Sequence, residues 1–565
     1  MTDYLPLWTK GYSAKSFGSD ALAGAILAIL LIPQAMAYAL LAGLPPQMGL
    51  YTAIIPPLLY ALLGQSAFVS VGPVALASLL VADAIGQSDL PPPEAAAIIA
   101  IEVGIVLLLL GIFRLGRLVN FVSEPALLGF TAGAAILIAV SQIPPFLGLD
   151  VPRSGTLPGA VQALWSAGAI HLPTVLIGAA VLASLLLADR YCAAGLWRLG
   201  IRPPFRLALV KSVPLLVISV AAFAALYAPD VATVDAPEGQ VFTLTLPPLD
   251  PAPWLSLLGS SAVIAVIVFV TGTAVAKSLS SRRRRPLDTD REALAVGAAN
   301  VAAGFTGGYA AGVSLSRSAL VFDTGARSPL ATAVAGAIVV PVMLFGGPAL
   351  SMLPATALAA LVISAVFGLV KVTEIKAVWQ HRKVEGGVIA VAFLATILLG
   401  VQWGLVAGAA AGVLTFLWFS SLPRVTRVGA ADGEDDVFRS TDRDEVTEDT
   451  TPVIVIRIDR SIYFGNVGHC ETQILDILAQ AKDAECLVLD MRAVNEVDAS
   501  GVRMINRLFN NLEEKDLKVG FAALHEPVKD AICSSAKARM APHFTTVKEG
   551  LEEMRALCGA DQRSG

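Results

Sequence analysis

The chain has 565 residues, of which 55% are hydrophobic, and its mean hydropathy is +0.70. These values are typical of a protein that crosses a membrane many times, and they exclude a chain that is soluble throughout. The net charge of −5 carries little information, because an apolar first part is followed by a polar second part.

Candidate membrane spans follow an N-terminal segment, residues 1–18, which lacks the features of a cleaved signal peptide. About 20 apolar residues cross the hydrocarbon core. We predict spans at 20–42, 48–64, 73–86, 94–113, 118–143, 172–189 and 208–227, and after an acidic stretch at 254–277, 290–306, 312–325, 328–346, 353–370, 384–400 and 402–421. Seven spans in each half predict an all-α inverted repeat, because an odd number inserts the second half upside down.

One short run in each half is interrupted by glycine, proline and polar residues. The third run opens with Ser70-Val71-Gly72-Pro73, and the tenth contains Ser314, Ser316 and Arg317. A charged residue inside a span marks a substrate or ion pathway, and the N-terminus of a half-helix attracts anions. We predict that the two half-helices meet near the bilayer midplane around one anion site. Two ordinary helices with tight glycine contacts are the alternative.

Basic residues in the loops agree with this span count. With the N-terminus in the cytoplasm, eighteen lysines and arginines fall in inner loops and one, Arg153, in an outer loop. The cluster Arg282–Arg285 is then a topology anchor, and because it abuts a span we expect no nucleic-acid partner. From Gly400 to Gly412 a glycine recurs at every fourth position, which lets a helix of the same chain or of a second subunit approach closely.

The composition changes after Pro423. Residues 424–451 are acidic and predict a linker, and 559–565 form a polar tail. Between them, 452–558 predicts a small α/β domain with strands at 453–458, 486–491, 518–524 and 544–547 and helices at 471–480, 501–512, 527–536 and 548–557. The domain has no nucleophile–base pair or phosphate-binding loop, so we predict no enzyme activity.

Four of the five cysteines and one serine bear on chemistry in this second part, and Cys192 lies alone in a loop of the first. The cysteines show no CxxC or Cys/His spacing, so we expect reduced thiols and no metal site. Ser500 is a regulatory candidate, because a phosphate at a helix start is stabilised by the helix dipole. The alternative is that Asp498 or Ser500 caps the helix that begins near Gly501.

Several motifs resemble the sulfate permease family: IPQAMAYALLAGLPPQMGLYTAIIPPLLYALLGQS (32–66), SVGP (70–73) and SLSRS (314–318). The C-terminal domain resembles the STAS domain of that family, and Asp498-Ala499-Ser500-Gly501 matches the loop that is phosphorylated in anti-sigma-factor antagonists. The resemblance covers nearly the whole chain. It implies a uracil-permease-like transport domain over 19–423, in which a core moves against a gate, and a homodimer in the bacterial cytoplasmic membrane with both termini cytoplasmic.

The same resemblance implies that the anion pocket is lined by Gln34, Tyr38, Val74, Ser316 and Arg317. Family members often have phenylalanine where this chain has Tyr38 and Val74, which implies a roomier and more polar pocket. Gly72 and Ser314, in the two interrupted runs, complete the predicted substrate site. An interhelical hydrogen bond is the alternative role for Gln34, and plain packing is the alternative for Tyr38.

Members that couple transport to sodium or protons often have a carboxylate in the eighth span, where this chain has Thr271. Hydroxyls and carbonyls alone make a weak sodium site, so sodium coupling is disfavoured. Glu102, deep in the fourth span, is the other coupling candidate, for a proton. A protonated carboxyl group that hydrogen-bonds a neighbouring helix is its alternative role. We predict no cofactor or metal beyond a coupling ion.

The leading functional hypothesis is a secondary transporter of a small oxyanion, sulfate first, that works by alternating access. Bicarbonate or a dicarboxylate would use the same positive pocket. An anion channel or electromechanical protein, and a signalling module with a cytosolic partner at the STAS domain, are the other classes. A nucleobase carrier is disfavoured by Arg317.

Overall fold

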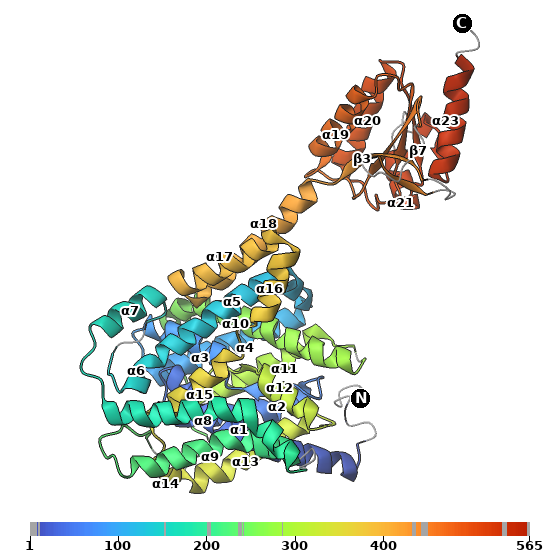
Figure 1. The fold of residues 1–565 in the computed structure, drawn as a ribbon. Helices are drawn as coiled ribbons and strands as arrows, with labels where there is room; N and C mark the ends of the chain where they lie inside the picture. Colours follow the sequence, from blue (N-terminus) through green and yellow to red (C-terminus); the bar gives the residue numbers. More distant parts are fainter. Residues whose placement is uncertain are drawn as a thin grey trace. The chain divides into compact units, whose positions relative to one another are not determined.

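The computed structural model describes residues 8, 12–151, 154–200, 205–235, 240, 242–284, 286–431, 437–441, 450–533 and 539–561. It divides into two compact units, Met1–Val413 and Leu414–Gly565, which are coloured blue to yellow-orange and orange to red in Figure 1. Most of 1–11, Arg153, Arg202, Arg285, parts of the predicted linker and the tail from residue 562 lie outside the described residues.

The first unit is helical, and each predicted span corresponds to one helix. The first half contains α1 (Ala14–Leu41), α2 (Pro46–Leu63), α3 (Ala75–Gly86), α4 (Pro92–Ile112), α5 (Glu124–Ser141), α8 (Leu172–Arg198) and α9 (Phe205–Ala225). The second half contains α10 (Pro251–Arg282), α11 (Thr289–Phe305), α12 (Leu315–Asp323), α13 (Leu330–Phe345), α15 (Ala355–Phe367), α17 (Lys383–Leu399) and α18 (Val401–Ser421). The predicted 7+7 arrangement is confirmed.

Shorter helices that the sequence did not predict connect the spans. They are η3 (Gly116–Phe121), α6 (Ile143–Leu147), α7 (Leu157–Trp165), α14 (Gly347–Leu350) and α16 (Val372–His381). Within the described residues, eight helices are long and apolar enough to cross a membrane, if α6 is counted with α5 and α16 with α15.

The third helix of each half is too short to cross a bilayer. Helix α3 has 12 residues and α12 has 9, which at 1.5 Å per residue gives about 18 Å and 14 Å against a hydrocarbon core of about 30 Å. Each is preceded by a two-residue strand, β1 (Val71–Gly72) and β2 (Gly312–Val313), and the two strands pair antiparallel. The interrupted runs therefore lie side by side, as the sequence predicts.

Small residues let the helices of this unit pack closely. Gly104 of α4 and Gly297 of α11 face each other, and a Cβ at Gly297 would lie 2.9 Å from the Gly104 carbonyl oxygen. Gly404 and Gly408 of α18 lie against Thr396 and Ala392 of α17. These two glycines of the Gly400–Gly412 series therefore serve packing within the chain.

Two buried carboxylates join distant segments of the first unit. Asp20 in α1 accepts hydrogen bonds from the backbone N–H of Arg327 at 2.6 Å and from the Ser328 hydroxyl at 2.6 Å. Glu292 in α11 accepts from the Tyr60 hydroxyl at 2.8 Å and from the backbone N–H of Ser66 at 3.0 Å. Each carboxylate is thus satisfied by neutral donors, which a buried charge requires.

The second unit has a six-stranded sheet in the order β4-β3-β5-β6-β7-β8, in which β4, β3 and β5 are antiparallel and β5 to β8 are parallel. Its strands are β3 (Val425–Ala430), β4 (Phe438–Ser440), β5 (Val453–Ile458), β6 (Cys486–Asp490), β7 (Lys518–Ala522) and β8 (His543–Phe544). Its helices are α19 (Val467–Gln480), α20 (Ala499–Glu513), α21 (Glu526–Cys533) and α23 (Val547–Asp561). The predicted α/β domain is confirmed.

The structure corrects two expectations for this unit. Strands β3 and β4 occupy part of the predicted linker, because Val428 and Phe438 are buried in the core of the sheet. Residues 432–436 and 442–449 of that linker lie outside the described residues. Cys486 and Cys558 form a disulfide, because α23 packs on β6 and brings together residues 72 apart in the sequence.

Candidate functional site

The two interrupted runs are held together by hydrogen bonds as well as by the β1–β2 pair. The backbone N–H of Ser314 donates to the Ser70 carbonyl at 3.1 Å, and the backbone N–H of Ser70 donates to the Ser318 hydroxyl at 2.9 Å. Ser314 also caps α12, because its hydroxyl accepts from the Arg317 backbone N–H at 3.4 Å. The start of α12 is therefore fixed against the start of α3.

Side chains from other spans hold the backbone just before β2. The buried amide of Asn300, in α11, donates to the Ala311 carbonyl at 3.1 Å and accepts from the Ala311 N–H at 2.8 Å. The Thr52 hydroxyl, in α2, accepts from the Tyr309 N–H at 3.0 Å. The sequence analysis missed both residues. A single asparagine in the run of small apolar residues 293–304 was the available signal.

Arg317 is fully buried and points at the first interrupted run. Its Nε donates to the Ser70 hydroxyl at 3.3 Å, and a Cβ at Gly72 would lie 3.6 Å from its Nη2. Both terminal nitrogens lack a hydrogen-bond partner, and within the described residues no carboxylate pairs with Arg317. An unpaired buried charge costs several kcal/mol, so an anion close to this guanidinium would be stabilised.

A cavity of about 850 Å³ lies beside the two helix starts. Its walls come from α1, α3, α5, α10, α12, α15 and the segment that leads into α16. The deep end includes buried Tyr38 and Thr273, and the opposite end includes exposed Lys277 and Lys371. The cavity therefore opens at the end of α10 that carries Lys277.

The structure brings most of the predicted substrate residues together. The residues that line the cavity are Tyr38, Val74, Ser314 and Ser316, and the coupling candidate Thr271 lines it as well. Gly72 and Arg317 lie behind this wall and close to each other. Gln34 is buried in α1, one turn before Tyr38. Oε1 of Gln34 has no hydrogen-bond partner, so no interhelical bond occupies that atom.

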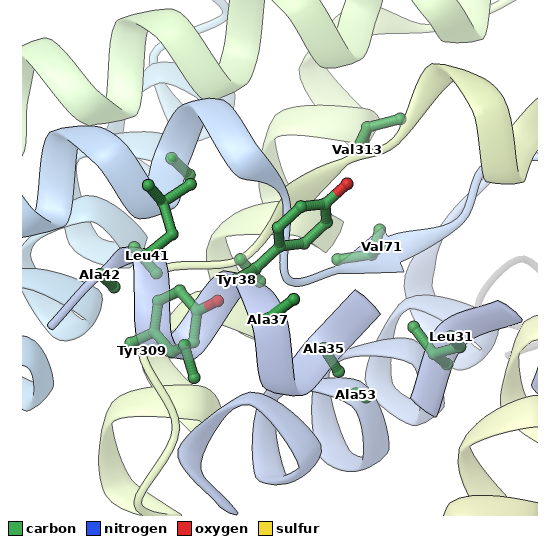
Figure 2. Packing of buried hydrophobic residues seen from close by; sticks show 14 of the residues in the cluster. Leu31, Ala35, Ala37, Tyr38, Leu41, Ala42, Ala53, Val71, Tyr309 and Val313 are labelled. Carbon is green, nitrogen blue, oxygen red and sulfur yellow. The ribbon is translucent and has the colours of Figure 1, made fainter. Parts of the chain in front are cut away.

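Figure 2 shows Tyr38 beside the paired strands, close to Val71 and Val313, with Tyr309 on the other side of α1. The Tyr309 hydroxyl lies 2.9 Å from the Ser78 hydroxyl of α3. Tyr309 is fully buried and is not among the residues that line the cavity. Sequence reasoning missed this pair, because nothing local relates position 78 to position 309.

The two coupling candidates lie on different helices and do not share a site. Glu102 is buried between α4 and α10 near Ser261, and its Oε2 has no hydrogen-bond partner. Thr271, although it lines the cavity, uses its hydroxyl to donate to the Ile267 carbonyl of its own helix at 2.7 Å. Neither residue therefore forms a cluster of ligands for a cation. Within the described residues, no group of three His, Cys, Asp or Glu side chains could hold a metal ion.

Ser500, the regulatory candidate, lies at the start of α20 in the second unit. Asp498 caps this helix by accepting from the backbone N–H groups of Ser500 and Gly501, each at 2.8 Å. Burial alone would raise the pKa of Asp498, but hydrogen bonds from Gly501, Phe464 and Ser500 lower it below its ordinary value. The Ser500 hydroxyl accepts from Arg503 at 3.0 Å. The cap is thus made by Asp498, and the Ser500 hydroxyl faces an arginine.

Comparisons with known proteins agree with this architecture. The sequence model of the sulfate permease family matches residues 17–392, and that of the STAS domain matches 445–550. The chain is 29% identical to sulfate transporter 4.1, chloroplastic, of Arabidopsis thaliana, over 97% of this chain and 79% of that protein. It is 30% identical to a Mycobacterium tuberculosis protein named as a probable sulfate transporter, over 93% of this chain and 92% of that protein.

Solved structures show the same fold. The murine anion transporter Slc26a9, in its inward-facing state, matches 98% of this chain and 94% of its own with a TM-score of 0.86 and 20% identity. The transmembrane domain of the cyanobacterial bicarbonate transporter BicA matches 71% of this chain and 98% of its own with a TM-score of 0.59 and 17% identity.

Proposed function

Because the chain belongs to the sulfate permease family and carries a STAS domain, we propose that it is a secondary transporter of a small oxyanion, sulfate first, that works by alternating access. The observation that carries this proposal is the buried, unpaired guanidinium of Arg317 behind a cavity lined by helix starts and hydroxyls. The names of the curated relatives favour sulfate among the oxyanions.

The anion would bind at the deep end of the cavity. Ser316 and Tyr38 both line the cavity, and the hydroxyl of each can donate to an oxyanion. The unsatisfied N–H groups at the starts of α3 and α12 add positive potential. Arg317 supplies a fixed charge from behind the wall, so it acts through the field and needs no direct contact.

Alternating access is supported by a cavity that opens beside the exposed Lys277. The helices of the two interrupted runs, with α1 and α10, would form the core, and α5 and α15 the facing gate. Under the positive-inside rule the Lys277 end lies on the cytoplasmic side of a bacterial inner membrane, and both termini lie on that side. We propose a homodimer, and a cytosolic partner at the STAS domain with Ser500 as its regulatory residue.

For coupling we propose a proton and disfavour sodium. Thr271 donates its hydroxyl hydrogen to its own helix, α10, which contains no carboxylate. The carboxylates that line the cavity, Glu124 and Glu374, lie on α5 and α16. Glu102 is the candidate proton carrier, because it is buried with one oxygen unpartnered. Bicarbonate and dicarboxylates remain the alternative substrates, and an anion channel is the alternative mechanism.

The test is uptake of labelled sulfate, bicarbonate and succinate by reconstituted protein across imposed proton and sodium gradients. We expect saturable sulfate uptake that a proton gradient accelerates and a sodium gradient does not. Non-saturating flux would indicate a channel. Faster uptake of bicarbonate or succinate than of sulfate would make that anion the substrate.

A further inference from the structure

A polar cluster joins three helices at the end of the first unit that is opposite the cavity mouth. The amide nitrogen of Gln402, the second residue of α18, donates to Asp83 Oδ2 at 3.1 Å and to the Ser260 hydroxyl at 3.2 Å. Asp83 lies near the end of α3, and Ser260 lies in the first third of α10. Gln402 therefore connects two helices of the proposed core to the last span.

The position of this cluster along α10 separates it from the cavity mouth. Ser260 and Lys277 are 17 residues apart on one helix, which corresponds to about 25 Å at 1.5 Å per residue. Helix α3 begins beside the anion site at Val74 and reaches the cluster at Asp83. A displacement of the α3 start would therefore move Asp83 relative to α18.

Gly155, just before α7, lies beside the cluster. Gly155 lies against Asp83 so closely that a Cβ there would overlap the carboxylate. Ser154, the preceding residue, lines a second cavity of about 270 Å³. That cavity also touches Ala37 and Leu40 of α1, whereas Tyr38 between them lines the larger one. One turn of α1 thus separates the smaller cavity on the Asp83 side from the larger cavity on the Lys277 side.

We propose that Gln402, Asp83 and Ser260 form the gate that holds the Asp83 side closed while the Lys277 side is open. The inference rests on the proposed alternating access. Opening of the Asp83 side separates α18 from α3 and α10, breaks the two Gln402 hydrogen bonds, and joins the smaller cavity to the anion site. A carboxylate paired with a neutral amide can serve as such a gate. Its hydrogen bond is strong because the acceptor is charged, and, unlike a salt bridge, it leaves no unpaired cation behind when it breaks.

The decisive experiment reverses donor and acceptor. Gln402→Glu places two carboxylates face to face and opens the gate, whereas Asp83→Asn combined with Gln402→Glu restores one amide–carboxylate pair. The readout is the labelling rate of a thiol introduced by Leu127→Cys in the larger cavity, or by Ala37→Cys at a buried position of the smaller one, with Cys192, Cys470 and Cys533 replaced by serine. Gln162→Glu makes the same chemical change on exposed α7 and serves as the control.

We expect Gln402→Glu to lower labelling at position 127 and raise it at position 37 by at least threefold each, the double variant to return both rates to the parent values, and Gln162→Glu to change neither. The proposed gate would be contradicted if Gln402→Glu left both labelling rates unchanged, or if the double variant did not restore them to the parent values. These rates require no transport, so absent sulfate uptake by the unmodified protein would contradict the proposed function and not the gate.

A cross-link provides a second test, which does not depend on whether the charge variants fold. In Asp83→Cys with Gln402→Cys, oxidation should abolish sulfate uptake and leave position 127 accessible, and reduction should restore uptake. Full uptake by the cross-linked protein would overturn the proposal.

Discussion

Arg317 is the residue on which the anion site depends. Its burial is complete, its Nε is anchored by Ser70, and its two terminal nitrogens are left without partners. A protein interior tolerates such a group only when something compensates it for part of its working cycle. A transported anion provides that compensation when it enters the cavity beside it.

Arg317→Gln should therefore weaken sulfate binding at least tenfold, which corresponds to about 1.4 kcal/mol, while the protein stays folded. The measurement is the KM of sulfate uptake together with thermal unfolding in detergent. Arg291→Gln is the control, because that arginine pairs with Asp288 on the exposed start of α11. Equal KM values for the two variants would show that Arg317 does not act on the anion.

Asp498 gives a prediction about pH at the same scale. Its pKa is lowered in the folded unit, so its contribution to stability is present above the unfolded value near 3.8 and is lost as the pH falls through the folded value. Asp498→Ala should cost about 1 kcal/mol at neutral pH through loss of the cap. Pulse proteolysis of the second unit in urea measures this difference, and a difference that grows toward acid pH would contradict the assignment.

At the scale of elements, the complete spans of the first unit hold the two interrupted runs in position. Asn300 binds both backbone groups of Ala311 and so sets the direction in which β2 leads into α12. Thr52 holds the same segment from α2. The half-helix is thus oriented by side chains of two complete spans, and its tip cannot drift without breaking these bonds.

Asn300→Ala should leave the N–H and C=O of Ala311 unsatisfied, at a cost of about 1–3 kcal/mol, and should raise the KM for sulfate. Asn300→Asp keeps the acceptor for the Ala311 N–H and should recover part of the loss in stability. Thermal unfolding and uptake kinetics measured together separate the two effects. A KM unchanged in a destabilised Asn300→Ala protein would limit this residue to a structural role.

How much the sequence reveals depends on whether a feature is local. The span pattern and the glycine, proline and serine breaks are local, and both were predicted. The partners of Asn300 were not, although they are only 11 residues apart, because the intervening turn has no sequence signature. Gln402 and Asp83 are 319 residues apart, and nothing in either helix identifies the other. Strand β3 was missed because its charged surroundings resemble a linker.

At the scale of the whole molecule, the two units have separate hydrophobic cores. The core of the first unit contains the site and the proposed gate, and that of the second unit is formed by the sheet and its helices. Since every residue that lines the 850 Å³ cavity belongs to the first unit, anion binding should not require the second.

A chain truncated after Pro423 should therefore bind sulfate with an affinity within about twofold of the full chain, since no contact to the anion is removed. Sulfate-dependent thermal stabilisation of both proteins in detergent tests this. A folded truncated protein that no longer responds to sulfate would assign the second unit a direct part in binding.

Anomalous diffraction from crystals soaked in selenate, a heavier analogue of sulfate, would show where the anion binds. We expect one anomalous peak in the large cavity, beside Ser316 and the two interrupted runs, and loss of that peak in Arg317→Gln. A peak confined to the exposed lysines at the cavity mouth, or one that persists unchanged in Arg317→Gln, would contradict this expectation.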